Sequence, residues 1–447
     1  MNIRSVEKER NSIVPPAHKT HVRWILAVFM WAAIVINYLD RTCMSAAAPD
    51  MMRELHVSAT MMGVIMSAFF WTYAGFQIPS GWIADRIGQR ITLAVAVVWW
   101  SLGTGATALS RGVAGLIGAR LFMGSGEAGV YPCNAGITAK WFPDKERGRV
   151  TAIFDSGTKF GTAFTMPLVA WMVAAYGWRV PFVVCGAMGV AWVVAWLSYY
   201  KDPEQHPSVS AAELKYIRDG QAKKEGIDKT QPMKWYELLK YRNVIAMCLG
   251  FFLFNYAIYF FITWFPTYLV KDRGMKMMTM GFFAMLPPLC GILAQWTGGI
   301  VTDYLYQRTG NLTFARKLNL GVGMIAATSI AFAGLARSNA VAITLLCVSY
   351  GGLAFAASAL WSLPGDIAPR NMTSVLSGIQ NCASNIGGIL GPIVTGYIVA
   401  TSGSFMLALA ISGVFCLLSA LTYLFMLGKI EPIHAPVMHG KALTPAA

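Results

Sequence analysis

The chain has 447 residues, of which 56% are hydrophobic and 13% are charged, and its mean hydropathy is +0.51. Soluble domains usually carry about 25% charged residues, so the composition excludes an ordinary soluble protein and indicates a membrane protein. The net charge of +15 does not indicate nucleic-acid binding, because such a ligand would need the basic residues on one folded face.

Twelve apolar stretches follow one another along the chain, each close to the roughly 20 residues that a helix needs to cross a bilayer. They begin near residues 22, 58, 91, 112, 148, 180, 243, 277, 318, 340, 373 and 404. Lys and Arg gather in the loops that lie inside if both termini are cytoplasmic, above all between Lys201 and Arg242. This asymmetry predicts a multi-pass protein of the cell (inner) membrane with both termini in the cytoplasm.

The predicted fold class is an all-α membrane protein with 12 transmembrane helices in two pseudo-symmetric six-helix bundles. Its predicted parts are a cytoplasmic tail 1–21, an N-terminal bundle 22–200, a cytoplasmic linker 201–242, a C-terminal bundle 243–427 and a cytoplasmic tail 428–447. In the linker, the stretch SAAELKYIRDGQAKK predicts a short surface helix capped by Ser210. We interpret the linker as a tether on the cytoplasmic face.

The two bundles are related by an internal repeat. The stretch GWIADRIGQR begins at Gly81, and GIVTDYLYQR begins 218 residues later at Gly299. The same offset maps Asn37 and Tyr38 onto Asn255 and Tyr256, while an offset of 226 maps Pro143 onto Pro369 and Gly161 onto Gly387. Such a duplication indicates a membrane carrier with its binding site between the halves.

The charged residues of these two stretches are candidates for a conformational latch at the inner end of the carrier. They are Asp85, Arg86, Arg90, Asp303 and Arg308. An aspartate there can cap a neighbouring helix and pair with a loop arginine, and such contacts would break when the carrier rocks open. The alternative is that these charges only anchor the loops among the lipid headgroups.

Charged residues deep in predicted helices occur only in the first half. They are Asp40, Arg41, Arg120, Glu127, Asp155 and Lys159. Because a charge inside a membrane is energetically expensive, each is a functional candidate. The counterparts of Asp40 and Arg41 in the second half are Ile258 and Tyr259. Ion coupling is therefore expected in the first half.

Arg120 and Glu127 are seven residues apart, so they share one helix face at a distance of about 10 Å. Small residues near Glu127 let another helix approach closely; they are Gly124, Gly126 and Gly129. An arginine suits a substrate carboxylate, and a buried carboxyl is a candidate proton carrier. A structural Arg–Glu pair is the alternative. Asp40 and Arg41 point about 100° apart, so only one of them need face a cavity.

Two helices carry polar stripes at spacings of three and four residues, which is one face of a helix. The fifth helix carries Thr151, Asp155, Thr158, Lys159, Thr162 and Thr165, and the eleventh carries Ser377, Gln380, Asn381, Ser384, Asn385 and Gly388. Asp155 and Lys159 lie within ion-pair reach of each other. Either they neutralise each other, or Lys159 reaches the cavity opposite Asn385 and holds a second polar or anionic end of the substrate.

These residues carry a resemblance to known families. The motif GxxxDRxGxR at Gly81 to Arg90 resembles the major facilitator superfamily. NYLDR at Asn37 and RLFMGSGEAGVYP at Arg120 are similar to the anion:cation symporters, which include bacterial sugar-acid permeases and vesicular glutamate carriers. YFFITWFPTYLV and RTGNLTFARK are similar to the glucarate and galactarate permeases, and the likeness spans about residues 20 to 430.

The resemblance implies proton-driven uptake of a small organic anion. It implies that Arg41 and Arg120 hold the substrate carboxylate and that Asp40 and Glu127 take the coupling protons. The polar contacts that it implies are Tyr38, Tyr73, Ser362 and Asn385. Helix seven lacks the arginine of the vesicular members, which counts against glutamate. Asp155 and Lys159 replace residues that are usually neutral, so the substrate need not be glucarate.

The leading hypothesis is a proton-coupled symporter that takes up an aldarate, aldonate or hexuronate by alternating access. The alternatives are sodium-coupled or exchange transport of another carboxylate, such as an aromatic acid or a dicarboxylate, and a non-transporting membrane sensor. An enzyme is not predicted, because no nucleophile–base pair or metal-ligand cluster is visible, and the eight cysteines show no CxxC spacing. The predicted partners are the anion, protons and the lipid bilayer, with no nucleic acid, cofactor or metal, for a carrier that works as a monomer.

Overall fold

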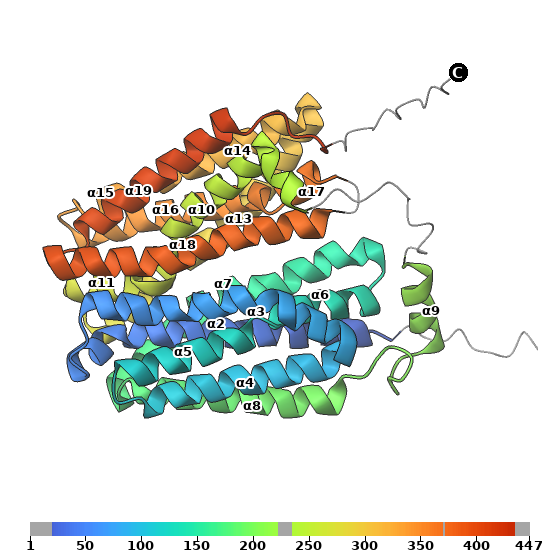
Figure 1. Ribbon diagram of the computed structural model, residues 1–447, viewed down its shortest axis with the longest axis horizontal. Helices are drawn as coiled ribbons and strands as arrows, with labels where there is room; N and C mark the ends of the chain where they lie inside the picture. The colour runs from blue at the N-terminus through green and yellow to red at the C-terminus, as the bar shows by residue number, and fades with distance from the viewer. Residues whose placement is uncertain (1–19, 222–234, 370–371, 434–447) are drawn as a thin grey trace, which may run out of the picture. The chain divides into compact units, whose positions relative to one another are not determined.

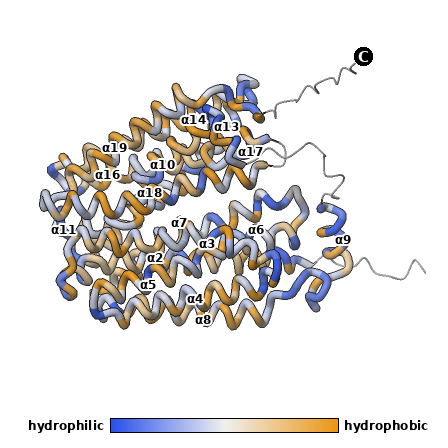
Figure 2. Tube along the Cα trace, in the orientation of Figure 1, coloured by the Kyte–Doolittle hydropathy of each residue, from blue (hydrophilic) through white to orange (hydrophobic). Residues whose placement is uncertain are grey.

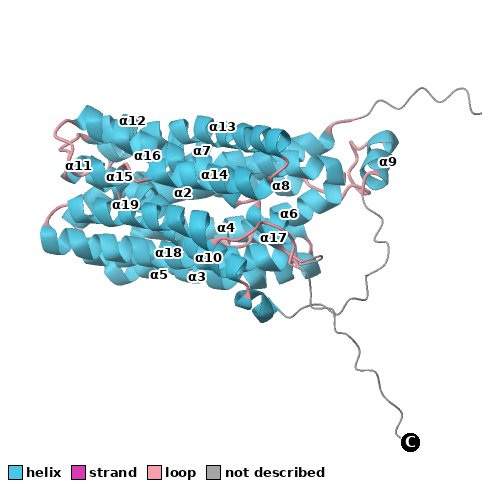
Figure 3. Ribbon diagram, turned by 90° about the horizontal axis from the view of Figure 1, so that it is seen from above, coloured by secondary structure: helices cyan, strands magenta, loops and turns pink. Residues whose placement is uncertain are grey.

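The computed structural model describes residues 20–221, 235–369 and 372–433, and within these ranges it contains helices and loops without a strand (Figures 1 and 3). Nine of the described helical segments are long and apolar enough to cross a membrane. Figure 2 shows apolar residues along the long helices α4, α8, α16 and α19 and hydrophilic residues in the loops around α9. The predicted all-α membrane fold is confirmed.

The described chain forms two compact units. Unit 1 takes in Met1–His56 and Ala68–Asp228, and unit 2 takes in Val57–Ser67 and Lys229–Ala447, as far as these are described. The first helices are α2 (Val22–Glu54), α3 (Ala59–Ile87), α4 (Gln89–Leu109), α5 (Val113–Glu127), α6 (Val130–Trp141), α7 (Asp144–Tyr176), α8 (Arg179–Tyr199) and α9 (Ala211–Asp219). All belong to unit 1 except the start of α3, which is assigned to unit 2.

Unit 2 contains the remaining helices. They are η1 (Trp235–Lys240), α10 (Arg242–Thr263), α11 (Phe265–Lys271), α12 (Met277–Ala284), α13 (Leu286–Thr309), α14 (Leu312–Ala327), α15 (Ile330–Ala333), α16 (Asn339–Leu360), α17 (Leu363–Ile367), α18 (Thr373–Ser402), α19 (Met406–Leu421) and η2 (Thr422–Met426). The twelve predicted stretches correspond to these helices, several of them broken into two pieces. The predicted boundaries of the bundles, linker and tails stay predictions, and the tails lie mostly outside the described residues.

The repeat seen in the sequence is a packing contact in each unit. In unit 1, α2 packs along α7, and in unit 2, α10 packs along α18. A Cβ added at Gly161 would lie 2.9 Å from the Cβ of Tyr38, and one added at Gly387 would lie 3.1 Å from the backbone nitrogen of Tyr256. Because glycine lets two helix backbones approach closely, the duplicated positions hold the same helix pair together in both units.

Two of the broken helices end beside predicted site residues. Helix α5 ends at Glu127, and α6 begins at Val130. Helix α16 ends at Leu360, and Ser362 is the N-cap residue of α17. A break leaves backbone groups without partners in their own helix, so within a membrane it occurs where the backbone is buried in protein or lines a cavity.

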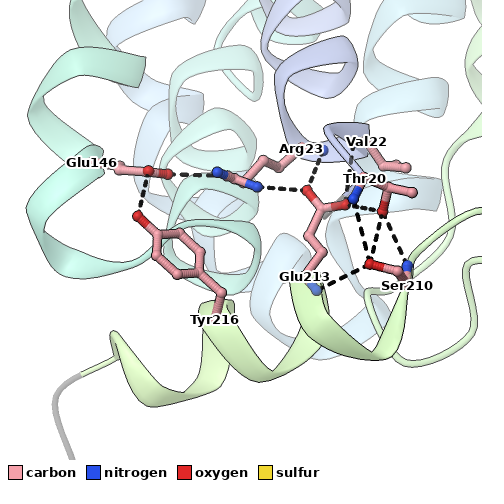
Figure 4. Close-up of polar contacts among 7 residues, drawn as sticks. All are labelled: Thr20, Val22, Arg23, Glu146, Ser210, Glu213 and Tyr216. Atoms are coloured by element: carbon pink, nitrogen blue, oxygen red, sulfur yellow. Dashed lines mark hydrogen bonds and ion pairs between the residues drawn. The ribbon is translucent and has the colours of Figure 1, made fainter. Parts of the chain in front are cut away.

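The helix α9 and the start of α2 cap each other (Figure 4). As predicted, Ser210 caps α9, since its Oγ accepts the backbone N–H of Glu213 at 3.2 Å. The side chain of Glu213 accepts the hydroxyl of Thr20 and the backbone N–H groups of Val22 at 3.3 Å and Arg23 at 3.4 Å. In return, the backbone N–H of Ser210 donates to Thr20 Oγ1 at 3.0 Å. Each helix start therefore satisfies backbone donors of the other.

An ion-pair network extends this contact to α7. Arg23 pairs with Glu213 at 2.7 Å and with Glu146 at 3.1 Å, and Tyr216 donates to Glu146 at 2.8 Å (Figure 4). The side chain of Glu213 is 0% exposed. This part of the linker is therefore a docked element of unit 1 and not the loose tether predicted from the sequence.

Replacing Glu213 should destabilise the protein strongly. We expect Glu213→Ala to lower the free energy of unfolding by about 3–5 kcal/mol, because Arg23 would remain buried with less compensation and α2 would lose its cap. The control is Glu204→Ala, whose partner Arg218 lies at 3.2 Å with both side chains more than half exposed; it should cost roughly 0–1 kcal/mol. Thermal unfolding of the detergent-purified variants measures both, and equal shifts would contradict the network's role.

Candidate functional site

A buried ion pair between α2 and α5 is the centre of the candidate site. The Nε and Nη2 atoms of Arg41 donate to the same oxygen of Glu127, at 3.0 Å and 2.9 Å. The side chain of Glu127 is 0% exposed and that of Arg41 is 7% exposed. The sequence alternative of a structural pair between Arg120 and Glu127 is therefore wrong about the partner, because the carboxylate binds the arginine of another helix.

Aromatic rings surround the guanidinium of Arg41. Its central carbon lies 4.9 Å from the ring centre of Tyr38, 4.6 Å from that of Phe69 and 5.0 Å from that of Tyr73. Ring faces stabilise a cation at these distances. The predicted residues Tyr38, Tyr73 and Arg41 are thus brought together. Phe69 was not predicted, although its position four residues before Tyr73 on α3 places both on one helix face.

Arg120 is a second buried cation beside the same ring. Its guanidinium carbon lies 4.9 Å from the ring centre of Phe69, and its Nη1 contacts the Sδ of Met123 at 3.4 Å. Among the described residues Arg120 forms no ion pair, and its Nε has no hydrogen-bond partner, although it is only 4% exposed. A buried charge without a close counter-ion is unfavourable, so an anion that enters here would be stabilised.

Asp40 lies in a different environment from its neighbour Arg41. It is 0% exposed, and the polar side chains near its carboxyl group are Thr104 and Trp100 of α4 and Cys185 of α8. Neither carboxyl oxygen reaches full hydrogen-bond geometry with a described residue. As the 100° spacing predicts, the two adjacent residues point to different surroundings: Arg41 to the aromatic rings and Asp40 to the interior between α4 and α8.

The stripe on α7 places its charged residues near this cluster. The Cβ position of Gly161 touches Tyr38, and Asp155 accepts a hydrogen bond from the hydroxyl of Tyr131 at 3.3 Å. Among the described residues Asp155 and Lys159 form no ion pair with each other. The prediction that they neutralise each other is therefore not met by this geometry.

The predicted contacts of unit 2 hydrogen-bond to helix backbones. Asn385 is 3% exposed and donates to the carbonyl of Asn381 at 3.1 Å. Ser362, at the break before α17, donates to the carbonyl of Ser358 at 3.3 Å. Gln380 is fully buried and donates to the carbonyl of Leu360 at 3.2 Å, which ties α18 to the end of α16. This unit thus offers neutral polar groups beside a helix break.

Within the described residues, the aspartates of the predicted latch form no ion pair. Arg90 donates to the carbonyl of Leu197 at 2.6 Å. Arg86 and Arg308 stack on rings of their own helices, those of Trp82 and Tyr304. The residues concerned in the latch are Asp85, Arg86, Arg90, Asp303 and Arg308. Their role stays a prediction.

An ion pair that the sequence reasoning missed joins Arg316 of α14 to Asp366 of α17, at 2.9 Å. Arg316 follows Arg90 by 226 residues, the same offset that relates Gly161 to Gly387. Each arginine lies near the start of its helix, α4 or α14. The change of offset from 218 to 226 could have identified Arg316, in place of Arg308, as the repeat partner of Arg90.

The chain is similar to known transporters over most of its length. The profile described as Major Facilitator Superfamily matches residues 30–392. The probable galactarate/D-glucarate transporter of Bacillus subtilis (strain 168) is 34% identical over 447 residues, covering 96% of this chain and 97% of that protein. The protein of the same description from Escherichia coli (strain K12) is 34% identical over 426 residues, covering 92% and 96%.

Other matches agree with this one. The hexuronate transporter of Bacillus subtilis (strain 168) is 35% identical over 389 residues, covering 86% of this chain and 90% of that protein. Among solved structures, a bacterial homologue of the human lysosomal transporter Spinster superposes with a TM-score of 0.73 at 17% identity, over 90% of this chain and 96% of that one. The last likeness bears on the fold alone.

The close approach of α5 to α3 should tolerate no side chain at Gly124. A Cβ there would clash with the backbone oxygen of Phe69 and lie 2.6 Å from Thr72 Oγ1, so Gly124→Ala should cost about 1–3 kcal/mol of stability. Gly118 on the same helix has nothing within 4 Å of its Cβ position. Gly118→Ala should therefore be neutral or stabilise by up to about 1 kcal/mol. Thermal unfolding separates the two; a harmless Gly124→Ala would refute the packing argument.

Proposed function

The chain belongs to the Major Facilitator Superfamily and is a membrane transporter, not an enzyme, and from this premise we propose that it takes up a small organic anion together with protons by alternating access. The proposed substrate is a sugar acid: an aldarate, an aldonate or a hexuronate. The carrier is proposed to work as a monomer in the cell (inner) membrane with both termini in the cytoplasm.

The observation that carries this proposal is the buried pair of Arg41 and Glu127 next to the uncompensated cation Arg120. A planar guanidinium with two donors directed at one oxygen suits a carboxylate of either the protein or a substrate. The same site can therefore hold an anionic ligand when Glu127 ceases to be an anion.

Proton coupling follows as an exchange of partners on Arg41. When a proton from water adds to a carboxylate oxygen of Glu127, the guanidinium loses its anionic partner and can donate its N–H groups to the substrate carboxylate. When Glu127 gives up that proton, it competes for Arg41 again and favours release of the substrate. Since a buried charge left without a partner is expensive, binding of the proton and of the anion are linked. Asp40 is proposed as the second proton carrier.

The substrate class is supported by the relatives and by the polar groups around the pair. Proteins similar to this chain are named as transporters of galactarate or D-glucarate, of D-galactonate and of hexuronate. All of these ligands combine carboxylates with hydroxyl groups, which need both cations and neutral hydrogen-bonding groups. The proposed binding residues are Arg41, Arg120, Tyr38, Tyr73, Lys159, Ser362 and Asn385.

Two further proposals complete this function. The charges of the repeated inner stretches act as the latch of the inner end, by the residues Asp85, Arg86, Arg90, Asp303 and Arg308. The competing mode of energy coupling is sodium symport or exchange of another carboxylate. Uptake of sugar acids into proteoliposomes, driven by an imposed pH gradient or by a sodium gradient in turn, tells the two modes apart; accumulation that follows only sodium would refute proton coupling.

Neutralising Glu127 should separate binding from coupling. We expect Glu127→Gln to mimic the protonated form, so that exchange of substrate across proteoliposomes survives while uphill accumulation on a pH gradient is lost. Glu204→Gln, at an exposed position, is the control and should retain both activities. If Glu127→Gln still concentrates substrate on a pH gradient, Glu127 has a packing role and not a proton role.

Arg120 should need its planar fork and not only its charge. Arg120→Lys should weaken substrate binding by about 2–5 kcal/mol, because a lysine cannot make the bidentate contact in a buried place. Arg53→Lys, at an 80% exposed position, should leave the Kd unchanged. Equilibrium binding of D-glucarate and D-gluconate measures the change. Near-normal affinity in Arg120→Lys would move the carboxylate site to Arg41.

A further inference from the structure

An expected ion pair on α7 is replaced by a hydrogen bond to another helix. Asp155 and Lys159 are four residues apart, the spacing at which an acid and a lysine on one helix face normally attract each other. Among the described residues no ion pair joins them, and the Oδ1 of Asp155 accepts the hydroxyl of Tyr131 at 3.3 Å. Lys159 is half-buried and has no described counter-ion within ion-pair distance.

The position of Tyr131 is fixed from its own side. Tyr131 is the second residue of α6 and follows the helix break after Glu127. Its ring packs edge-on against Phe154 of α7, with ring centres 6.3 Å apart. The next residue, Pro132, lies against α3 at Gly81. The hydroxyl of Tyr131 is therefore presented to Asp155 by packing, and Asp155 turns toward it.

Lys159 is close to the proposed carboxylate site. It lies two residues, about 3 Å along the helix axis, before Gly161. A Cβ at Gly161 would meet Tyr38, whose ring lies 4.9 Å from the guanidinium carbon of Arg41. An anion-binding ammonium group near a guanidinium provides two separated cationic positions on unit 1.

We propose that Tyr131 is a positioning residue that holds Asp155 away from Lys159, and that Lys159 thereby stays available to bind the second carboxylate of a dicarboxylate substrate. The inference rests on the proposed function and narrows the substrate class from sugar acids in general to aldarates. One carboxylate lies at Arg41 and Arg120, and the other lies at Lys159. An aldonate, which has a hydroxyl group in place of the second carboxylate, leaves Lys159 without an anionic partner.

The test compares D-glucarate with D-gluconate, which differ only in whether the sixth carbon is a carboxylate or an alcohol. Equilibrium binding to the full-length purified protein is measured for both acids. Lys159→Gln should weaken D-glucarate binding roughly tenfold or more and change D-gluconate binding little. Tyr131→Phe should have the same selective effect, because the released Asp155 can pair with Lys159 and compete with the substrate.

A double variant distinguishes positioning from a merely structural role. Asp155→Asn alone should be mild, and in the double variant Tyr131→Phe with Asp155→Asn the affinity for D-glucarate should return, because no carboxylate remains to capture Lys159. The matched control is Tyr176→Phe, at an exposed position at the end of α7, which should bind both acids normally.

Several outcomes would overturn the proposal. Equal loss of both acids in Tyr131→Phe, or no rescue by Asp155→Asn, makes Tyr131 structural. Rescue of a damaged Lys159→Gln by Asp155→Asn, with unchanged preference between the acids, makes Asp155 and Lys159 a structural pair. A wild-type protein that binds D-gluconate as tightly as D-glucarate, or neither acid, removes the dicarboxylate assignment. Intact selective binding without pH-driven uptake would instead refute only the proposed symport.

Discussion

A carboxylate and a guanidinium held 2.9 Å apart in the interior of a membrane protein must compensate each other almost completely. Each charge loses several kcal/mol of solvation on burial. The compensation comes from two N–H donors on one oxygen and from the ring faces of Tyr38, Phe69 and Tyr73 around Arg41. Since removing either partner leaves the other exposed to this penalty, the pair can open only when a proton or another anion takes the vacant place. That constraint links charge binding at the site to proton binding.

The surrounding helices exist in a form that makes this pair possible. Gly124 lets α5 approach the backbone of α3, and Gly126 lets it approach α4. Helix α5 then ends at Glu127, so the residues that follow, among them Tyr131, can turn toward α7. Small residues and a helix break are typical of sites in membrane carriers because they bring backbone and side chains close to a ligand.

The two units share a scaffold and differ in charge. The contact of Gly161 with Tyr38 is repeated by Gly387 with Tyr256, so the α2–α7 and α10–α18 pairs are built alike. Unit 1 adds charged groups at this scaffold, whereas unit 2 supplies amides and a hydroxyl that bond to helix backbones. Neutral groups select hydrogen-bonding partners without the desolvation penalty of a charge. At the other end of α2, the mutual caps with α9 fix the helix that carries Asp40 and Arg41.

The sequence by itself determined the features that depend on composition and spacing. Apolar length predicted the membrane helices, the two offsets predicted the repeat, and the rarity of charge inside a membrane singled out Asp40, Arg41, Arg120 and Glu127 before any contact was known. Ser210 was recognised as a cap because a helix start is a local pattern.

Only the tertiary structure decided which partner each of these groups has. Spacing pointed from Glu127 to Arg120 on the same helix, yet its partner is Arg41, 86 residues away. Spacing pointed from Asp155 to Lys159, yet the contact is with Tyr131 of another helix. Residue intervals specify what shares one face of one helix, whereas the partner of a buried charge is set by how separate helices pack, and that packing depends on glycines and breaks distributed over the whole unit.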